Sequence, residues 1–259
     1  MKIFPIASSS SGNCTVIECG DSVVLIDCGV TLKKIKAAVV DLNRIKAVFI
    51  THEHSDHVGG VGPLSRKVDC PFYVNGASVK KKEKVFADCK TIKNLESGNN
   101  VVIDNLINIL AFTTKHDAAY SVGFIINQVG KENKKLGYVT DTGFITPMMA
   151  SYLSGCSALF IEADYDDTMM DEYELYDEFL KDRIRSNFGH LSNAQMIEFI
   201  ETNMNLVDMD FVIVGHLSGR TNSPERVQEL IDKNFKEHSN KFHIAPLKGK
   251  SYGNFERKI

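Results

Sequence analysis

Short apolar runs recur along the chain, and turns rich in glycine or polar residues separate them. Runs of this kind are typical of buried strands, whereas apolar residues three and four positions apart indicate helices. In the first half the pattern predicts strands over residues 2–6, 14–18, 22–26, 47–50, 72–74, 100–103, 106–112, 121–127 and 135–140. Helices are predicted there over residues 32–40 and over the lysine-rich segment 77–86. Strands therefore dominate the first half.

The second half alternates between strands and helices. Strands are predicted over residues 157–163, 210–214 and 242–245. Helices are predicted over residues 146–153, 173–185, 192–204 and 224–237. Each sheet needs a partner layer for its apolar faces, so two sheets between layers of helices satisfy both halves. Because no long linker or internal repeat divides the chain, we expect one α/β domain over residues 1–259.

The composition is that of an ordinary globular protein. Hydrophobic residues make up 43% and charged residues 24% of the chain, and the formal charge of −3 gives no overall attraction to nucleic acid. The sequence starts without the apolar stretch of a signal peptide, and no run approaches the roughly 18 apolar residues of a membrane span. Six cysteines without a C-x-x-C pair indicate reduced thiols. We therefore expect a cytoplasmic protein that is not associated with a membrane.

The segment Thr51–His57 is the densest cluster of chemically active side chains. It reads THEHSDH, so that His52, His54, Asp56 and His57 lie within six positions, directly after a predicted strand. Neutral imidazole is the most common metal ligand, and a set of imidazoles and carboxylates suits Zn²⁺, Mn²⁺ or Fe. A polar loop that is rich in histidine by chance is the other interpretation. The H-x-H-x-D-H spacing favours a metal site.

Three further candidate ligands follow other predicted strands. His116, Asp141 and His216 each come after an apolar run. Each alone could be a turn or cap residue. The recurrence of the arrangement indicates instead that strand ends gather these side chains at one edge of a sheet. The expected metal ligands are therefore His52, His54, Asp56, His57, His116, Asp141 and His216.

Seven ligands suffice for two metal ions. The expected division is His52, His54 and His116 at one ion and Asp56, His57 and His216 at the other. Asp141 would bridge the two ions, because a carboxylate offers two oxygens. A coordination position left to water is typical of catalytic metal sites, and two cations would make that water a nucleophile near neutral pH. Asp27 ends another predicted strand, where it could orient a ligand imidazole or only form a turn.

These residues occur in the order found in the metallo-β-lactamase superfamily, which the chain resembles over nearly its full length. The resemblance implies a four-layer αββα sandwich with a dinuclear site at one edge of the two sheets. A closer resemblance to the YycJ/WalJ branch rests on residues 9–13, 51–57, 116–119, 140–143, 189–193 and 216–218. The chain departs from the expected pattern at residues 162–166 and 220–222.

The YycJ/WalJ resemblance implies a 5′-to-3′ DNA exonuclease in the cytoplasm, with a link to DNA repair and two divalent ions (Zn, Mn or Fe) as cofactors. Residues 189–193 and 216–218 are also similar to ribonuclease Z. That similarity implies that His190 protonates the leaving oxygen and that Glu162 keeps this imidazole protonated. The catalytic candidates are therefore Asp56, His190 and Glu162. His190 could instead cap the helix predicted from residue 192.

Other function classes stay open. A small-molecule hydrolase, such as a cyclic phosphodiesterase, lactonase or thioesterase, would use the same metals, but lactone or thioester cleavage does not need the pair of His190 and Glu162. A non-catalytic binding protein is disfavoured by the full ligand set. DNA is the expected partner, and the basic residues Lys181, Arg183 and Arg185 could contact its backbone or be ordinary exposed charges.

Overall fold

The strands form two sheets that pack against each other. The computed structural model describes residues 1–247 and 256–259, and within these residues each sheet has seven strands. The first sheet consists, in spatial order, of β14 (Arg257–Lys258), β1 (Lys2–Ala7), β2 (Cys14–Cys19), β3 (Ser22–Ile26), β4 (Ile45–Phe49), β5 (Phe72–Val74) and β6 (Ile92–Asn94). The second consists of β13 (Phe242–Ile244), β12 (Phe211–Gly215), β11 (Ala158–Glu162), β10 (Lys135–Val139), β9 (Val122–Gln128), β8 (Ile107–Thr113) and β7 (Asn100–Ile103).

The direction of the strands decides where the connecting loops lie. Strands β3 to β6 are parallel to one another, as are β10 to β13. Strand β8 runs in the same direction as β10, because both are antiparallel to β9. In each sheet, loops that follow strands of one direction leave from the same edge, which is where ligands bind in open α/β sheets. The segments that carry the predicted ligands all follow such strands.

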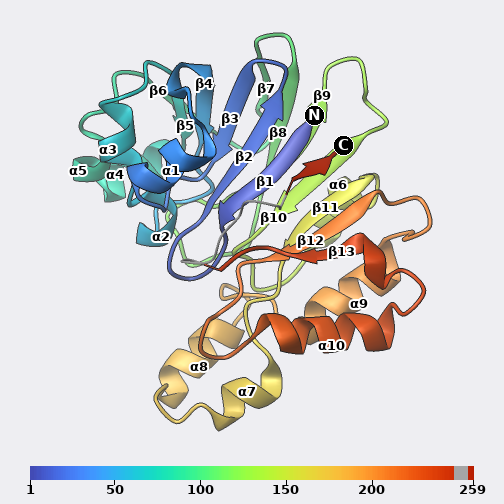
Figure 1. Cartoon of the computed structure of the whole chain (residues 1–259). Coiled ribbons are helices and arrows are strands. Elements are labelled where there is room, and N and C mark those ends of the chain that lie inside the picture. The colour runs from blue at the N-terminus through green and yellow to red at the C-terminus, as the bar shows by residue number, and fades with distance from the viewer. Residues whose placement is uncertain (248–255) are drawn as a thin grey trace.

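Helices cover the outer face of each sheet (Figure 1). The helices are α1 (Leu32–Ala38), α2 (Ser55–Val58), α3 (Val61–Ser65), α4 (Gly76–Lys81), α5 (Glu83–Phe86), α6 (Pro147–Leu153), α7 (Asp167–Glu172), α8 (Glu178–Arg185), α9 (Asn193–Asn203) and α10 (Pro224–Asn234). Ile35 of α1 and Leu64 of α3 are buried in one cluster with Val48 of β4. Ile200 of α9 and Ile231 of α10 are buried in another with Val214 of β12. Two short 3₁₀ helices span Leu42–Arg44 and Ser239–Lys241.

A third apolar cluster fills the space between the sheets. Phe49 of the first sheet meets Phe124 of the second edge to face, with 5.8 Å between ring centroids. The hydroxyl groups of Tyr138 and Thr15 lie 3.2 Å apart and form a buried hydrogen bond between the two sheets. The layers therefore follow the order helix, sheet, sheet, helix, and the predicted αββα sandwich is confirmed.

Two predicted helices differ from those observed. The predicted helix over residues 77–86 is divided into α4 and α5, because Lys82 leaves the helical region with φ −131° and ψ 40°. The predicted helix over residues 173–185 begins only at Glu178, since the Asp177 side chain accepts a hydrogen bond from the Leu180 N–H and caps it. Helix α7 precedes it and ends at Glu172. In the described parts of the chain, no helix combines the length and the apolar character needed to cross a bilayer.

Candidate metal centre

The predicted ligands come from the ends of strands in both sheets. The segment Thr51–His57 follows β4, and its last three residues belong to the short helix α2. His116 follows β8, Asp141 follows β10, and His216 follows β12 directly. Loops from the two facing sheets therefore bring together side chains that are up to 164 positions apart, from residue 52 to residue 216.

These side chains form two groups that correspond to the expected division. The ligand atoms of the first group lie within 4.8 Å of one another and belong to His52, His54 and His116. Those of the second group meet the same limit and belong to Asp56, His57 and His216. Asp141 lies between the groups, with its Oδ1 4.0 Å from Nε2 of His52 and 3.3 Å from Nε2 of His216. All seven predicted ligands thus lie at one place.

Several atoms of this cluster are buried without a hydrogen bond. Within residues 1–247 and 256–259, Nε2 of His52, Nε2 of His216 and Oδ2 of Asp141 have no hydrogen-bond partner. A buried polar atom that makes no hydrogen bond costs about 1–3 kcal/mol, so folded proteins rarely leave one. Imidazole nitrogens and a carboxylate oxygen that converge in this way match the donor set of Zn²⁺, Mn²⁺ or Fe. The residues present therefore fit divalent metal ions.

The charges of the cluster also favour cations. Burial raises the pKa of Asp141, but the neighbouring His216, His57 and His52 outweigh it and hold that pKa well below its usual value. Burial and the nearby His57 hold the pKa of His52 well below the ordinary range, and burial lowers the pKa of His116 to about 4. The ionised Asp141 and the neutral His52 and His116 are in the protonation states that bind a metal ion. Burial lowers the pKa of His57 and of His216, but Asp141 and other carboxylates outweigh burial and raise it well above its usual value, so a metal ion would displace a proton from each of these two rings.

Asp27 fixes the orientation of one predicted ligand. Its Oδ2 lies 2.8 Å from Nδ1 of His57, and its Oδ1 accepts a hydrogen bond of 2.8 Å from the backbone N–H of Thr51. The contact leaves Nε2 of His57 to face the other ligands. Asp27, Asp141 and His216 have positive φ angles of 62°, 56° and 52°, which side chains other than glycine rarely adopt. Such backbone strain of about 1–3 kcal/mol is concentrated at functional sites.

His190 and Glu162 form a pair beside the cluster. Nδ1 of His190 lies 3.1 Å from Oε2 of Glu162, while Oε1 accepts hydrogen bonds from the backbone of Thr142 (2.7 Å) and Leu191 (3.2 Å). Burial lowers the pKa of His190, but Asp164, Glu162 and Asp141 outweigh burial and raise it to about 9.

The alternative in which His190 caps the following helix is wrong. The N-cap of α9 is Ser192, whose side chain accepts a hydrogen bond from the backbone N–H of Gln195. The Gln195 side chain in turn accepts one from the backbone N–H of Ser192, which completes a capping box. Nδ1 of His190 is thus left to Glu162.

Comparison with known proteins identifies the family. The sequence matches the beta-lactamase superfamily domain over residues 23–205. Exodeoxyribonuclease WalJ of Streptococcus pneumoniae is 32% identical over 232 residues, which are 85% of this chain and 82% of that protein. The chain belongs to the beta-lactamase superfamily. Exodeoxyribonuclease YycJ of Bacillus anthracis is 31% identical over 193 residues, or 73% of this chain and 72% of its own, so the YycJ/WalJ-like branch is also confirmed.

A solved structure agrees with this membership. The metallo-β-lactamase fold protein YhfI from Bacillus subtilis superimposes with a TM-score of 0.74 over 99% of both chains, at 16% identity. At this identity the similarity concerns the fold. The family match, the exodeoxyribonuclease relatives and the cluster of histidines and aspartates show that this protein is a metal-dependent hydrolase.

Two carboxylates of the site were missed by the sequence analysis. Oδ1 of Asp117 lies 3.4 Å from Nε2 of His116 and 3.8 Å from Nε2 of His54. Oδ1 of Asp164 lies 3.6 Å from Nδ1 of His216. Each follows a predicted site residue by one or two positions, since Asp117 comes after His116 and Asp164 comes after Glu162. That proximity in sequence was the available signal.

The predicted basic cluster is not a free cationic surface. Nζ of Lys181 is bonded to the backbone oxygen of Asp171 at 3.1 Å, and Arg185 pairs with the side chain of Asp171. Nε of Arg183 donates to Oδ2 of Asp117 at 2.6 Å. Each of the three cations thus has an acidic partner within the molecule, which for Lys181 is Glu178 at 3.2 Å. Contact of this cluster with DNA stays a prediction.

Proposed function

We propose that this hydrolase cleaves phosphodiesters of DNA as a 5′-to-3′ exonuclease and that it acts in DNA repair in the cytoplasm. We further propose that residues 1–259 form one domain and hold two divalent ions. The expected ligands of those ions are His52, His54, Asp56, His57, His116, Asp141 and His216. The metals that suit these donors are Zn, Mn or Fe.

The pair of His190 and Glu162 is the observation that carries this proposal. A phosphodiester releases an alkoxide, which needs a proton as the bond to phosphorus breaks. His190 lies next to Asp141, with its Nδ1 3.8 Å from Oδ1 of that carboxylate, so its ring borders the place where substrate would bind. Glu162 holds the imidazole in its protonated form and fixes its direction. Cleavage of a lactone or thioester does not need such an acid.

The remaining site residues would bind the metal ions and orient the ligand side chains. Bound divalent ions would make a water nucleophilic near neutral pH and would neutralise charge on the phosphodiester. Asp27 holds the His57 ring in place through their 2.8 Å contact. Asp56 faces the same centre, with Oδ2 3.3 Å from Nε2 of His57. We assign catalytic roles to Asp56, His190 and Glu162.

The names of the relatives support DNA as the substrate. The two curated proteins described above are both exodeoxyribonucleases, and one covers 85% of this chain. A ribonuclease J of Mycoplasma pneumoniae is 31% identical over a shorter stretch, 39% of this chain. The cysteines of the described residues are all free thiols, which supports a reducing compartment.

A substrate panel tests the proposal. The metal-loaded protein would be incubated with a 5′-phosphorylated duplex DNA, an RNA of the same sequence, a bis-aryl phosphodiester and a lactone. We expect release of nucleotides from the 5′ end of DNA, with rates that fall steeply as salt increases. The variant His52→Ala should abolish this activity, and His238→Ala, whose histidine lies outside the metal centre, should retain it. Cleavage of the lactone alone would contradict the proposal and favour a small-molecule hydrolase.

A further inference from the structure

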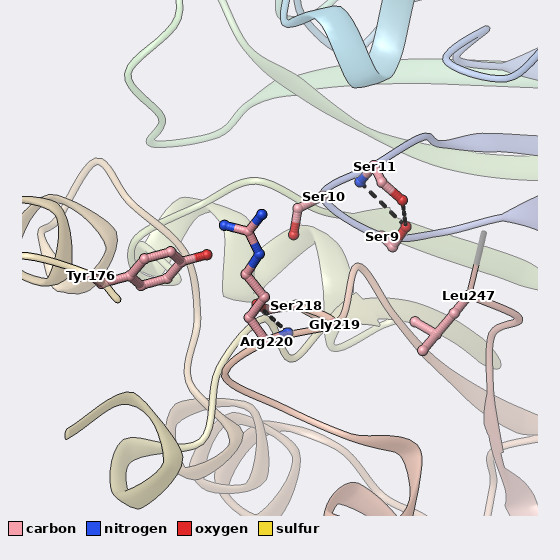
Figure 2. A pocket seen from close by; sticks show the side chains of 8 residues that line it. All are labelled: Ser9, Ser10, Ser11, Tyr176, Ser218, Gly219, Arg220 and Leu247. Atoms are coloured by element: carbon pink, nitrogen blue, oxygen red, sulfur yellow. Dashed lines mark hydrogen bonds between the residues drawn. The ribbon is translucent and has the colours of Figure 1, made fainter. Parts of the chain in front are cut away.

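A cavity of about 470 Å³ lies next to the metal centre, between the loop after β1 and the loop after β12 (Figure 2). Its size falls within the range of small-ligand sites, roughly 300–1,000 Å³. The residues that line it are Ser9, Ser10, Ser11, Tyr176, Ser218, Gly219, Arg220 and Leu247. In the described residues, no carboxylate side chain belongs to this lining. The lining therefore carries one cation, Arg220, and several hydroxyl groups.

The loop after β1 carries Ser9, Ser10 and Ser11, and we call it the serine loop. It lies between this cavity and the candidate metal ligands. The Ser10 hydroxyl donates to Oδ1 of Asp164 at 3.4 Å, and the same oxygen lies 3.6 Å from Nδ1 of His216. Asn13 links the other side, because its side-chain amide donates to the backbone oxygen of Ser9 at 3.0 Å and lies 3.1 Å from Oδ2 of Asp56. A group bound in the cavity would thus lie close to the metal centre.

Arg220 differs from most other arginines in the described residues. Five of those pair with a carboxylate, namely Arg44, Arg66, Arg183, Arg185 and Arg226. Within residues 1–247 and 256–259, Arg220 has no such ion pair. Its guanidinium lies 5.8 Å from the centre of the Tyr176 ring, and Figure 2 shows it extending into the cavity toward Ser10. This contact steadies the side chain through the ring face and leaves its N–H groups available to a ligand.

This set of donors matches a phosphate group. A guanidinium presents two parallel N–H groups to two phosphate oxygens, and a hydroxyl group that rotates away from its present acceptor, as that of Ser10 would from Asp164, donates to the remaining oxygen. Ser218 is buried and its hydroxyl accepts hydrogen bonds from the backbone of Arg220 (3.3 Å) and Thr221 (3.2 Å), so the arginine extends from a fixed turn. The cavity therefore offers a positioned cation where an anion would be desolvated.

A second cavity on the other side of the serine loop indicates how a DNA strand would run through the site. This cavity, of about 610 Å³, is lined by Ser10 and Ser11 and also by Asp56. A strand whose cleaved bond lies at the metal centre can continue along this second cavity, while its end occupies the first. Tyr176 and Leu247 add apolar surface to the first cavity, which suits the end of a strand better than a backbone that continues in both directions.

We propose that the cavity around Arg220 binds the terminal 5′-phosphate monoester of the DNA substrate. This inference rests on the function proposed above and defines which DNA end the enzyme prefers. A terminal phosphate monoester carries a charge of about −1.5 to −2 near neutral pH, more than an internal phosphodiester. The guanidinium of Arg220 therefore distinguishes an end that bears phosphate from one that bears a hydroxyl group.

Binding measurements test this assignment independently of catalysis. Three single-stranded oligonucleotides of one sequence would carry a 5′-phosphate, a 3′-phosphate or no terminal phosphate, with phosphorothioate linkages that slow cleavage. Fluorescence anisotropy with the metal-loaded protein should show about tenfold tighter binding of the 5′-phosphorylated strand. In Arg220→Gln this preference should fall to nearly one, and in Ser10→Ala it should decrease by a smaller factor. Arg66→Gln, which changes an exposed arginine directly after α3, is the matched control and should retain the preference.

Three results would overturn the assignment. They are equal binding of the three strands by the unaltered protein, a preference for the 3′-phosphate, and an equal loss of affinity for all three strands in Arg220→Gln. The last would mean that Arg220 contacts an internal phosphodiester. A nuclease assay on the same strand with ordinary linkages tests the proposed function separately. Retained 5′-phosphate preference without nucleotide release would contradict the exonuclease activity while supporting the phosphate site.

Discussion

Nδ1 of His190 lies 3.1 Å from Oε2 of Glu162, at the edge of a centre whose other histidines face one another. We therefore predict that His190→Ala affects DNA cleavage and the cleavage of an activated ester differently. Because His190 would protonate the leaving oxygen, its loss should lower turnover of DNA by about 10²–10⁴-fold. Hydrolysis of a bis-nitrophenyl phosphodiester should decrease far less, since nitrophenolate leaves without a proton. Steady-state kinetics on both substrates measures the difference.

Metal content is the control for that experiment. Elemental analysis of His190→Ala should give the same metal content as the unaltered protein, because a proton donor is not a ligand. Equal losses of metal and of activity on both substrates would instead make His190 a metal ligand and contradict its assignment as the acid.

Glu162→Gln should change the pH profile and not only the rate. Glu162 and Asp164 help to raise the pKa of His190 to about 9, so the imidazole is protonated below that pH and loses its proton as the pH rises through it. Turnover that needs the protonated ring should therefore decline on the alkaline side near pH 9. Glutamine lacks the negative charge, so the pKa should fall and the decline should begin at lower pH. An unmoved alkaline limb in Glu162→Gln would contradict this role of the carboxylate.

The sequence predicted the strands better than the short helices. Apolar strands such as Ser22–Ile26 and Phe72–Val74 were predicted with their observed bounds, because a buried strand is defined by its own apolar run. The break at Lys82 could not be predicted in the same way. Lysine favours helices, and nothing in the residue type indicates the non-helical backbone that Lys82 adopts, with φ −131° and ψ 40°.

The residues of the candidate site that directly follow a strand could be predicted from the sequence. The seven expected ligands share that position, and parallel strands bring such residues to one edge. Asp117 was missed because its role depends on Arg183, which lies 66 positions later and holds its carboxylate near His116. Nor does the sequence show that Arg183 is paired with a carboxylate. Whether a charge is free depends on tertiary contacts that a single sequence does not reveal.

Asp27→Asn should weaken metal binding. The 2.8 Å contact between Asp27 and Nδ1 of His57 fixes the ring, and loss of such a partner typically reduces metal affinity by about 10–100-fold. Competition with a chromophoric chelator measures the affinity. Asp88→Asn, which removes an exposed partner of Arg66, is the matched control and should bind metal normally. Unchanged affinity in Asp27→Asn would mean that the protein holds His57 without this carboxylate.

Removal of metal should lower the thermal stability. Buried atoms such as Nε2 of His52 and Oδ2 of Asp141 lack hydrogen bonds in the described structure, and a bound ion would contact them. Because the folded chain brings these atoms together and the unfolded chain does not, the ion stabilises the folded state relative to the unfolded state. An ion present at 100 times its dissociation constant adds about 2.7 kcal/mol. For a chain of this size that corresponds to a decrease in Tm of roughly 5–10 °C after chelation. Scanning calorimetry with chelator, followed by restored metal, measures the change, and His52→Ala should show a smaller dependence on metal.

The buried thiols should react slowly in the folded protein and faster at alkaline pH. Burial raises the pKa of Cys70 and of Cys156 to about 12, and that of Cys89 to about 11. The thiolate is the reactive form, so the rate is limited by the very small fraction of each group that is thiolate at pH 7.5, and that fraction grows about tenfold with each pH unit up to the pKa. Cys89 is partly exposed and should react first among the three, whereas Cys70 and Cys156 are buried. Mass spectrometry of iodoacetamide labelling at pH 7.5 and 9.5, with urea-unfolded protein as the reference, measures these rates. Labelling of native Cys156 at the unfolded rate would show that its site opens to solvent far more often than this packed core implies.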